Sequence, residues 1–300
     1  MSQPWPRSSG GDRIEVVALA LGHQDPHVIV PKPSFTALLN CADVLIVNGQ
    51  GLEDAWLPVV LAASTNSRLM PGKPGYVDAS QGARLIPYAA EELERPLFLH
   101  AVLGVAAALG ATPAEQPSTA NHHYWLDPAN GESMAQAIMA RLELLDPENA
   151  SFYQENYVRF ATRLQDKMAI WDTMMRPYAG TKLASYHRSW TYLANRHGFE
   201  IVGYVEPKEP LVPGPTTVSR PPGRTALAAV VTRMQQQQAK LLVVETYYDR
   251  AVAAQVAKRA GAHLLFLPAS VSQHDGIDDY FQLFERVYQE LLLALSGTRN

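Results

Sequence analysis

Apolar and polar residues form alternating blocks along the chain, and these blocks predict strands separated by helices. Short continuous apolar runs bounded by turn residues are typical of buried strands in a parallel sheet. We expect such strands at 14–21, 43–47, 75–77, 183–186, 200–205, 240–244 and 263–267. Segments whose apolar residues recur three and four positions apart predict helices at 34–41, 51–63, 95–109, 130–145, 190–196, 225–238, 251–260 and 279–295.

The longest helical pattern begins at Asp146-Pro147, with Asp as the N-cap and Pro at the first helical position. Its apolar residues recur from Tyr153 to Met175, so an unbroken helix would be roughly 40 Å long. We therefore expect an α/β protein in which two parallel-sheet lobes, 1–146 and 177–300, are joined by a linking helix at 147–176. A long packing helix within one domain is the alternative.

Composition narrows the function classes. The chain has 300 residues, a net charge of −4 and no basic run, which argues against a nucleic-acid surface. Its single cysteine, Cys41, excludes an internal disulfide and a multi-thiolate metal site. No apolar run is long enough for a transmembrane helix, and no signal peptide is visible at the start. We expect either a cytoplasmic protein or one whose leader is absent from this sequence.

Three candidate metal ligands follow predicted strands. His27, His187 and Glu245 each lie just past the carboxyl end of one, which is the edge where open α/β sheets bind ligands. His123 lies in the loop 121–127, which leads through Asp127-Pro128 into a helix. Three imidazoles and one oxygen suit a tetrahedral Zn²⁺ site, although imidazole also suits Fe, Cu and Ni.

The other histidines have simpler interpretations as surface or structural residues: His23, His100, His122, His197, His263 and His274. We do not expect His122 to share an ion with His123, because the two are adjacent in a loop. His197 precedes Gly198 and is expected to interact with a helix C-terminus, whereas His100 and His263 are expected to be partly buried. Glu245 could equally be a structural carboxylate.

Several motifs, in order and spacing, resemble one family. These are Gly10-Gly-Asp-Arg-Ile-Glu-Val, Asp25-Pro-His27 with Pro31-Lys-Pro-Ser34, the strand and turn 42–53, Asn121–Pro128, Asp146-Pro-Glu-Asn-Ala150, Ser185-Tyr-His187 leading to Tyr204-x-Glu206-Pro, and Val244-Glu245. From Gly10 to about Leu295 the chain resembles the periplasmic zinc/manganese-binding proteins of ABC importers, the TroA/ZnuA-like solute-binding proteins of cluster A-I. The stretch Asn121–Pro128 is similar to that family's Asn-Pro-His-x-Trp-Leu-Asp-Pro.

The resemblance implies two lobes with a metal site in the cleft between them. It also implies that the amino-terminal lobe lacks the family's first strand if this sequence is truncated. It implies His27 and His123 as ligands from the first lobe, with His187 and Glu245 from the second. Many family members carry an aspartate ligand after the last strand, but the matching region 267–271 has none. The fourth position therefore falls to Glu245, His274, Asp275 or water.

The expected function is extracytoplasmic or periplasmic capture of a divalent metal ion by a monomer that passes it to an ABC transporter permease. Three histidines favour Zn²⁺ over Mn²⁺ or Fe²⁺ as cargo. One alternative is a His₃ zinc hydrolase with Glu245 as general base. Another is a receptor for a metal chelate or organic solute, in which Arg188, Trp190 and Tyr247 would line the cleft.

Overall fold

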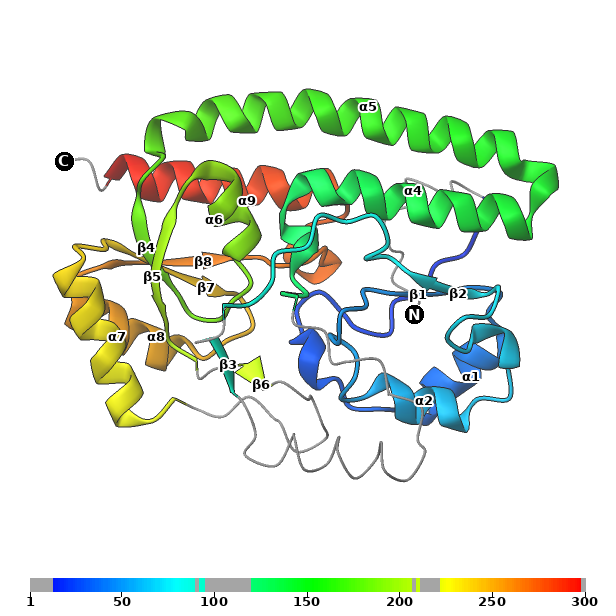
Figure 1. Ribbon diagram of the computed structural model, residues 1–300, viewed down its shortest axis with the longest axis horizontal. Coiled ribbons are helices and arrows are strands. Elements are labelled where there is room, and N and C mark those ends of the chain that lie inside the picture. Colours follow the sequence, from blue (N-terminus) through cyan, green and yellow to red (C-terminus); the bar gives the residue numbers. More distant parts are fainter. Residues whose placement is uncertain (1–12, 90–91, 95–119, 207–208, 211–221, 298–300) are drawn as a thin grey trace.

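The computed structural model describes residues 13–89, 92–94, 120–206, 209–210 and 222–297. Figure 1 shows two groups of parallel strands, at opposite ends of the molecule, under one long helix. This arrangement confirms the expected fold class, an α/β protein with two parallel-sheet groups and a long helix. The division of the chain at residues 146 and 176 remains a prediction.

The carboxyl-terminal group is a four-stranded parallel sheet in the order β5-β4-β7-β8. Its strands are β4 (Lys182–Ser185), β5 (Glu200–Tyr204), β7 (Leu241–Glu245) and β8 (His263–Leu267). Both faces of the sheet are covered, which is why these segments read as continuous apolar runs. Leu241 and Val243 belong to one core cluster and Leu242 and Val244 to the other, as the alternation of side chains along a strand requires.

Helices cover the two faces of this sheet. On one face lie α7 (Arg224–Gln236) and α8 (Arg250–Ala260), and on the other lie α6 (Thr191–His197) and α9 (Tyr280–Gly297). Gly198 and Gly261, which follow α6 and α8, both have φ of +67°, the left-handed conformation in which Gly ends a helix.

The amino-terminal group is much smaller. Two three-residue strands, β1 (Leu45–Val47) and β2 (Tyr76–Asp78), pair in parallel. They pack with α1 (Pro33–Cys41) and α2 (Leu57–Ala63) around a core that includes Phe35 and Trp56. A further two-residue pair joins β3 (Leu93–Glu94) to β6 (Glu209–Pro210).

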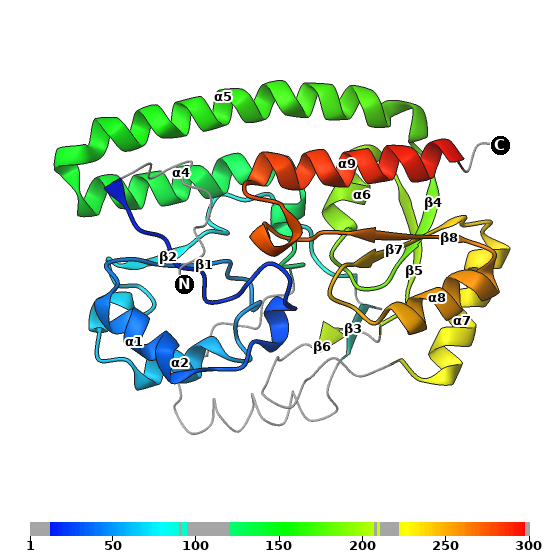
Figure 2. The ribbon, with the colours of Figure 1, turned by 180° about the vertical axis from the view of Figure 1, so that it is seen from behind.

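The long helix spans both groups. A 3₁₀ turn at Pro147–Asn149 leads into α5 (Ala150–Met175), which has 26 residues and is about 39 Å long. In Figures 1 and 2, α5 runs over α4 (Pro128–Leu145) at the amino-terminal end and over α9 at the carboxyl-terminal end. Leu164, Trp171 and Met175 bury its inner face in the larger core cluster.

Two expectations about the amino-terminal half are wrong. Residues 14–21 form no strand, because among the described residues β1 pairs only with β2 and this segment has no neighbour in the ladder. The helix expected at 51–63 begins only at Leu57, since residues 50–56 are turns that start with positive φ at Gln50 and Gly51. The helix expected at 95–109 lies outside the described residues.

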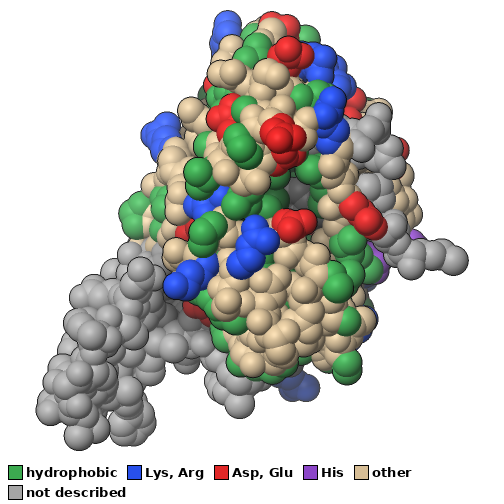
Figure 3. All heavy atoms as spheres, turned by 90° about the vertical axis from the view of Figure 1, so that its right-hand side faces the viewer, with side chains coloured by type: hydrophobic (Ala, Val, Ile, Leu, Met, Phe, Trp, Pro, Cys, Tyr) green, Lys and Arg blue, Asp and Glu red, His purple; other side chains and the backbone are tan. Residues whose placement is uncertain are grey.

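Two surface properties agree with the composition. In the described part of the chain, no helix combines the length and the apolar character needed to cross a bilayer. On the end face seen in Figure 3, acidic and basic side chains are mixed with apolar ones rather than gathered by sign. This face gives no support to a nucleic-acid surface.

Candidate metal centre

Four histidines from distant parts of the chain form one cluster. The ligand nitrogens of His27, His122, His123 and His187 all lie within 4.8 Å of one another. The rings pack closely, with centroids 5.0 Å apart for His27 and His187 and 4.8 Å apart for His123 and His187. The three histidines that the sequence analysis selected therefore lie together, although they are far apart along the chain.

Each of these three rings is oriented by a hydrogen bond at Nδ1. The Nδ1 of His27 contacts Asp25 Oδ1 at 2.6 Å, and the Nδ1 of His187 contacts Glu206 Oε2 at 2.6 Å. The Nδ1 of His123 contacts Asn121 Oδ1 at 2.9 Å. These oxygens can only accept, so Nδ1 is the protonated nitrogen and Nε2 presents a lone pair. Such partners behind a histidine are typical of metal sites, because they fix the tautomer and the ring direction.

His27 reaches the centre from a loop. Asp25 caps the 3₁₀ turn Pro26–Val28 by accepting a hydrogen bond from the backbone N–H of His27. The indole of Trp56 donates to the Pro26 carbonyl at 3.0 Å and connects this turn to the core of the amino-terminal group. One carboxylate thus holds both the backbone and the ring of His27.

The loop 121–127 is fixed by both halves of the molecule. From the carboxyl-terminal half, Tyr192 donates to the Asn121 carbonyl at 2.6 Å, and the Ala269 carbonyl accepts from Trp125 at 2.7 Å. From the other half, Asn48 donates its side-chain N–H to the His122 carbonyl at 2.9 Å. The loop that carries two of the four rings is therefore held on both sides.

Burial keeps the central imidazoles neutral. His123 is fully buried and His122 is 7% exposed, and burial first, then the neighbouring histidines, lowers both pKa values well below the usual 6.5. No hydrogen-bond partner reaches the Nε2 of His123 within the described residues. A neutral, buried nitrogen without a partner carries a desolvation cost that a metal ion would remove.

Carboxylates lie outside the group of four. Glu245, expected as a fourth ligand, is fully buried on the strand next to His187 but is not among the clustered side chains. Burial raises its pKa to about 7, against the attraction of His187. His122 was not expected to share an ion with His123, yet both rings belong to the cluster, with centroids 4.5 Å apart. The signal that could have indicated this is His122 itself, at the place of the family's Pro.

The remaining candidates lie elsewhere. His23 and His274 are exposed and pack against each other, with ring centroids 5.2 Å apart. His197 is buried and contacts Tyr288 Oη at 2.8 Å, while His263 is exposed rather than partly buried. His100 lies outside the described residues. Among the residues proposed for a chelate cleft, Arg188 and Trp190 are 3% and 2% exposed, which leaves little surface for an organic ligand.

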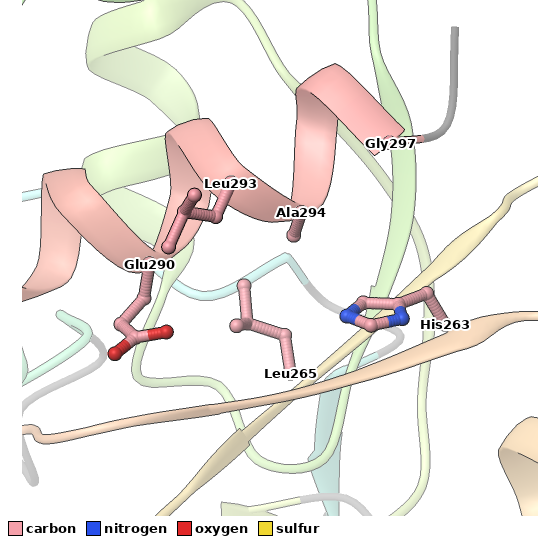
Figure 4. Close-up of a pocket in the computed structure, with 6 residues that line it drawn as sticks. All are labelled: His263, Leu265, Glu290, Leu293, Ala294 and Gly297. Atoms are coloured by element: carbon pink, nitrogen blue, oxygen red, sulfur yellow. The ribbon is translucent and has the colours of Figure 1, made fainter. Parts of the chain in front are cut away.

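A surface cavity of about 270 Å³ lies between α9 and β8 (Figure 4). Its lining consists of His263, Leu265, Glu290, Leu293, Ala294 and Gly297. None of the four clustered histidines contributes to it. The cavity is therefore not the candidate metal centre.

Two strand groups, a bridging helix and a buried histidine cluster between them define a two-lobed protein of the metal-binding class. The sequence model of the family described as "ZnuA: Zinc-uptake complex component A periplasmic" matches residues 7–294. The chain belongs to this family, which confirms the resemblance. The family is a transport component rather than an enzyme, and the hydrolase alternative gains no support.

Individual relatives carry names for two metals. The "High-affinity zinc uptake system protein ZnuA" of Brucella suis is 25% identical over 58% of this chain and 50% of its own length. The "Manganese-binding lipoprotein MntA" of Halalkalibacterium halodurans is 22% identical over 95% of this chain and 83% of its own. The chain spans about half the length of several curated relatives that it matches.

Solved structures agree on the fold. A crystal structure of ZnuA superposes with a TM-score of 0.72 at 23% identity, covering 96% of this chain and 93% of the other. A manganese-bound periplasmic metal-binding protein from Candidatus Liberibacter asiaticus gives 0.70 at 20% identity. These likenesses show the fold.

Proposed function

We propose that this protein captures Zn²⁺ outside the cytoplasm and delivers it, as a monomer, to the membrane permease of an ABC importer. The observation that carries the proposal is that imidazole nitrogens from distant parts of the chain lie within 4.8 Å of one another. His27, His123 and His187 are the metal ligands that we propose. Family membership supports the transport role.

Ligand chemistry supports zinc as the cargo. Imidazole nitrogen suits Zn²⁺, whereas Mn²⁺ is usually bound with more carboxylate and water oxygen. A tetrahedral ion with Zn–N bonds of about 2.05 Å places its ligand nitrogens roughly 3.3 Å apart. The group of four has nitrogens 2.8 Å apart at the His27–His122 contact and within 4.8 Å overall, so small ring shifts would produce that geometry.

A competition titration with a zinc chelator tests the proposal. We expect one tightly bound Zn²⁺ per chain and a large loss of affinity in His123→Ala and His187→Ala. His263→Ala is the matched control, because that imidazole is exposed and outside the group of four. Unchanged zinc affinity in both ligand variants would overturn the proposal.

A further inference from the structure

His122 stands where the family motif has Pro, and its ring belongs to the cluster. The Nε2 of His122 lies 2.8 Å from the Nε2 of His27. The ring is buried, and its centroid is 4.9 Å from that of His27. Two ring nitrogens from distant parts of the chain thus lie close enough to share a proton or a metal ion.

The hydrogen bonds around both rings decide which nitrogens carry protons. His27 donates its Nδ1 proton to Asp25, so its Nε2 is a lone pair in the neutral ring. The ring of His122 also forms a hydrogen bond with the backbone of Gln50. This bond favours the protonated imidazole, so the ring is the donor and the Gln50 carbonyl is the acceptor. With the Nε2 of His122 facing His27, this bond uses the other ring nitrogen. In the neutral rings two lone pairs therefore face each other, an arrangement that a cation between them would stabilise.

The turn that holds His122 has an unusual backbone. Gly49, Gln50 and Gly51 all have positive φ, of 78°, 54° and 84°. Among the described residues, only two non-glycine residues have positive φ, and Gln50 is one of them. Its side chain donates to Ser80 Oγ at 2.8 Å. A Cβ at position 49 would lie 2.3 Å from Asp78 Oδ1, so the turn requires Gly there. Strained backbone of this kind is typical of functional sites, and here it supplies the His122 partner.

The backbone of His122 is held from the same side. Asn48 donates to the His122 carbonyl, and Tyr124 donates to the Asn48 carbonyl at 2.6 Å. Both the ring and the backbone of His122 are thus positioned by the segment after β1. A ring that is buried only to fill the core would need neither the hydrogen bond from Asn48 to its carbonyl nor the one between its ring and Gln50.

From these contacts we infer that His122 is a fourth metal ligand and that it determines metal specificity, by replacing the expected carboxylate with an imidazole. This inference rests on the proposed function. The first coordination sphere would then contain four neutral nitrogens, while Asp25 and Glu206 balance the charge from behind the rings. An all-nitrogen tetrahedral site suits Zn²⁺ and disfavours Mn²⁺, which prefers oxygen ligands and more of them.

The test measures zinc and manganese affinities of His122→Gln, His122→Asp and His123→Gln beside His263→Ala. We expect His122→Gln to weaken zinc binding more than about 100-fold, because loss of a ligand should exceed the 10–100-fold cost of losing a partner behind one. His122→Asp should lower the ratio of zinc to manganese affinity, since it supplies a carboxylate. Thermal denaturation of each metal-free variant identifies any that fail to fold.

The outcomes separate the two proposals. If His122→Gln binds zinc as the parent does while His123→Gln does not, the inference about His122 is wrong and the proposed function stands. If the parent protein binds no zinc, the proposed function fails instead. NMR of protein labelled with ¹⁵N-histidine gives an independent count. Four Nε2 resonances should shift on zinc loading, and three would overturn the inference.

Discussion

The candidate site contains the same chemical unit twice, mounted on two different supports. His187 with Glu206 and His27 with Asp25 each pair an imidazole with a carboxylate at 2.6 Å. The His187 and Glu206 side chains are 6% and 8% exposed, and the pair follows strands of the four-stranded sheet. The His27 and Asp25 side chains are 21% and 14% exposed and lie on a 3₁₀ turn in a half with little sheet.

This difference in exposure and in structural support indicates that the two pairs have different roles in zinc binding. Rigid elements hold a ligand in precise geometry, whereas segments with few buried contacts open more readily. We therefore expect the His187 pair to set the strength of zinc binding and the His27 pair to be the side through which the ion exchanges. The predictions that follow test this contrast, from the largest expected effect to the smallest.

Removing either imidazole should give the largest effect. His187→Ala and His27→Ala should each weaken zinc binding more than about 100-fold, because each removes a ligand rather than its support. The contrast predicts the greater loss for His187→Ala, whose vacated position is buried. Chelator competition measures both affinities, with His263→Ala as the control. A greater loss for His27→Ala would reverse the assignment of roles.

Removing the carboxylates should cost less. Glu206→Gln and Asp25→Asn keep the side-chain size but remove the charge behind the ring, so a 10–100-fold loss of zinc affinity is expected. Glu206→Gln should be the more severe, since its pair is less exposed to water. Glu155→Gln, on the exposed face of α5, is the matched control and should bind zinc as the parent does. Equal losses of zinc affinity in Glu206→Gln and Asp25→Asn would contradict the proposed difference between the two pairs.

Acid should destabilise the carboxyl-terminal half, which contains the four-stranded sheet, through protonation of His197. Burial lowers the pKa of this imidazole to about 4, from the 6.5 expected in the unfolded chain. The unfolded state therefore gains a proton first, and the free energy of unfolding falls as the pH drops from 6.5 towards 4. At pH 5, His197 alone contributes about 2 kcal/mol to this loss, and the buried His122 and His123, whose pKa values are also lowered, add to it.

Urea denaturation of the metal-free protein across this pH range measures the effect. His197→Gln should flatten the pH dependence relative to the parent, while His263→Gln, an exposed control, should not. A parent curve that the His197 substitution leaves unchanged would contradict the assignment.

The smallest effect should come from the contact that closes the His27 loop. A Cβ at Gly22 would lie 1.9 Å from the Val271 carbonyl oxygen, so Gly22→Ala must move the loop away from the carboxyl-terminal half. We expect faster zinc dissociation with a less than about 10-fold loss of affinity, because the ligands themselves remain. Stopped-flow release to a chelator measures the rate. Gly223→Ala, where φ is −68° and a Cβ meets nothing within 4 Å, controls for an added methyl group at a Gly outside the His27 loop.

The sequence predicted the carboxyl-terminal half better than the amino-terminal half, and the physical reason is the extent of pairing. Strand β8 was expected at 263–267 and is found there, because its apolar residues pack against core clusters on both faces of the sheet and so leave a continuous apolar run. The run at 14–21 looks similar but forms no strand, since that depends on a neighbour distant in the sequence.

The site was also predicted only in part, because part of it depends on contacts between residues distant in the sequence. His27, His123 and His187 could be chosen from strand ends, a loop and family motifs, and the structure brings their rings together. His122 was not chosen, because it is adjacent to His123 and because the direction of its ring depends on contacts distant in the sequence, the turn at Gly49–Gly51 and the carbonyl of Gln50. Glu245 ends strand β7, as expected, and β7 pairs with the strand that leads to His187, but the Glu245 carboxylate is outside the group of four.

X-ray absorption at the zinc edge of the protein loaded with one equivalent of Zn²⁺ tests the central claim most directly. The account predicts a first shell of nitrogen at about 2.0–2.1 Å, with the outer-shell scattering of imidazole rings. A sulfur shell at about 2.3 Å, which would indicate Cys41, or a first shell without imidazole would contradict it.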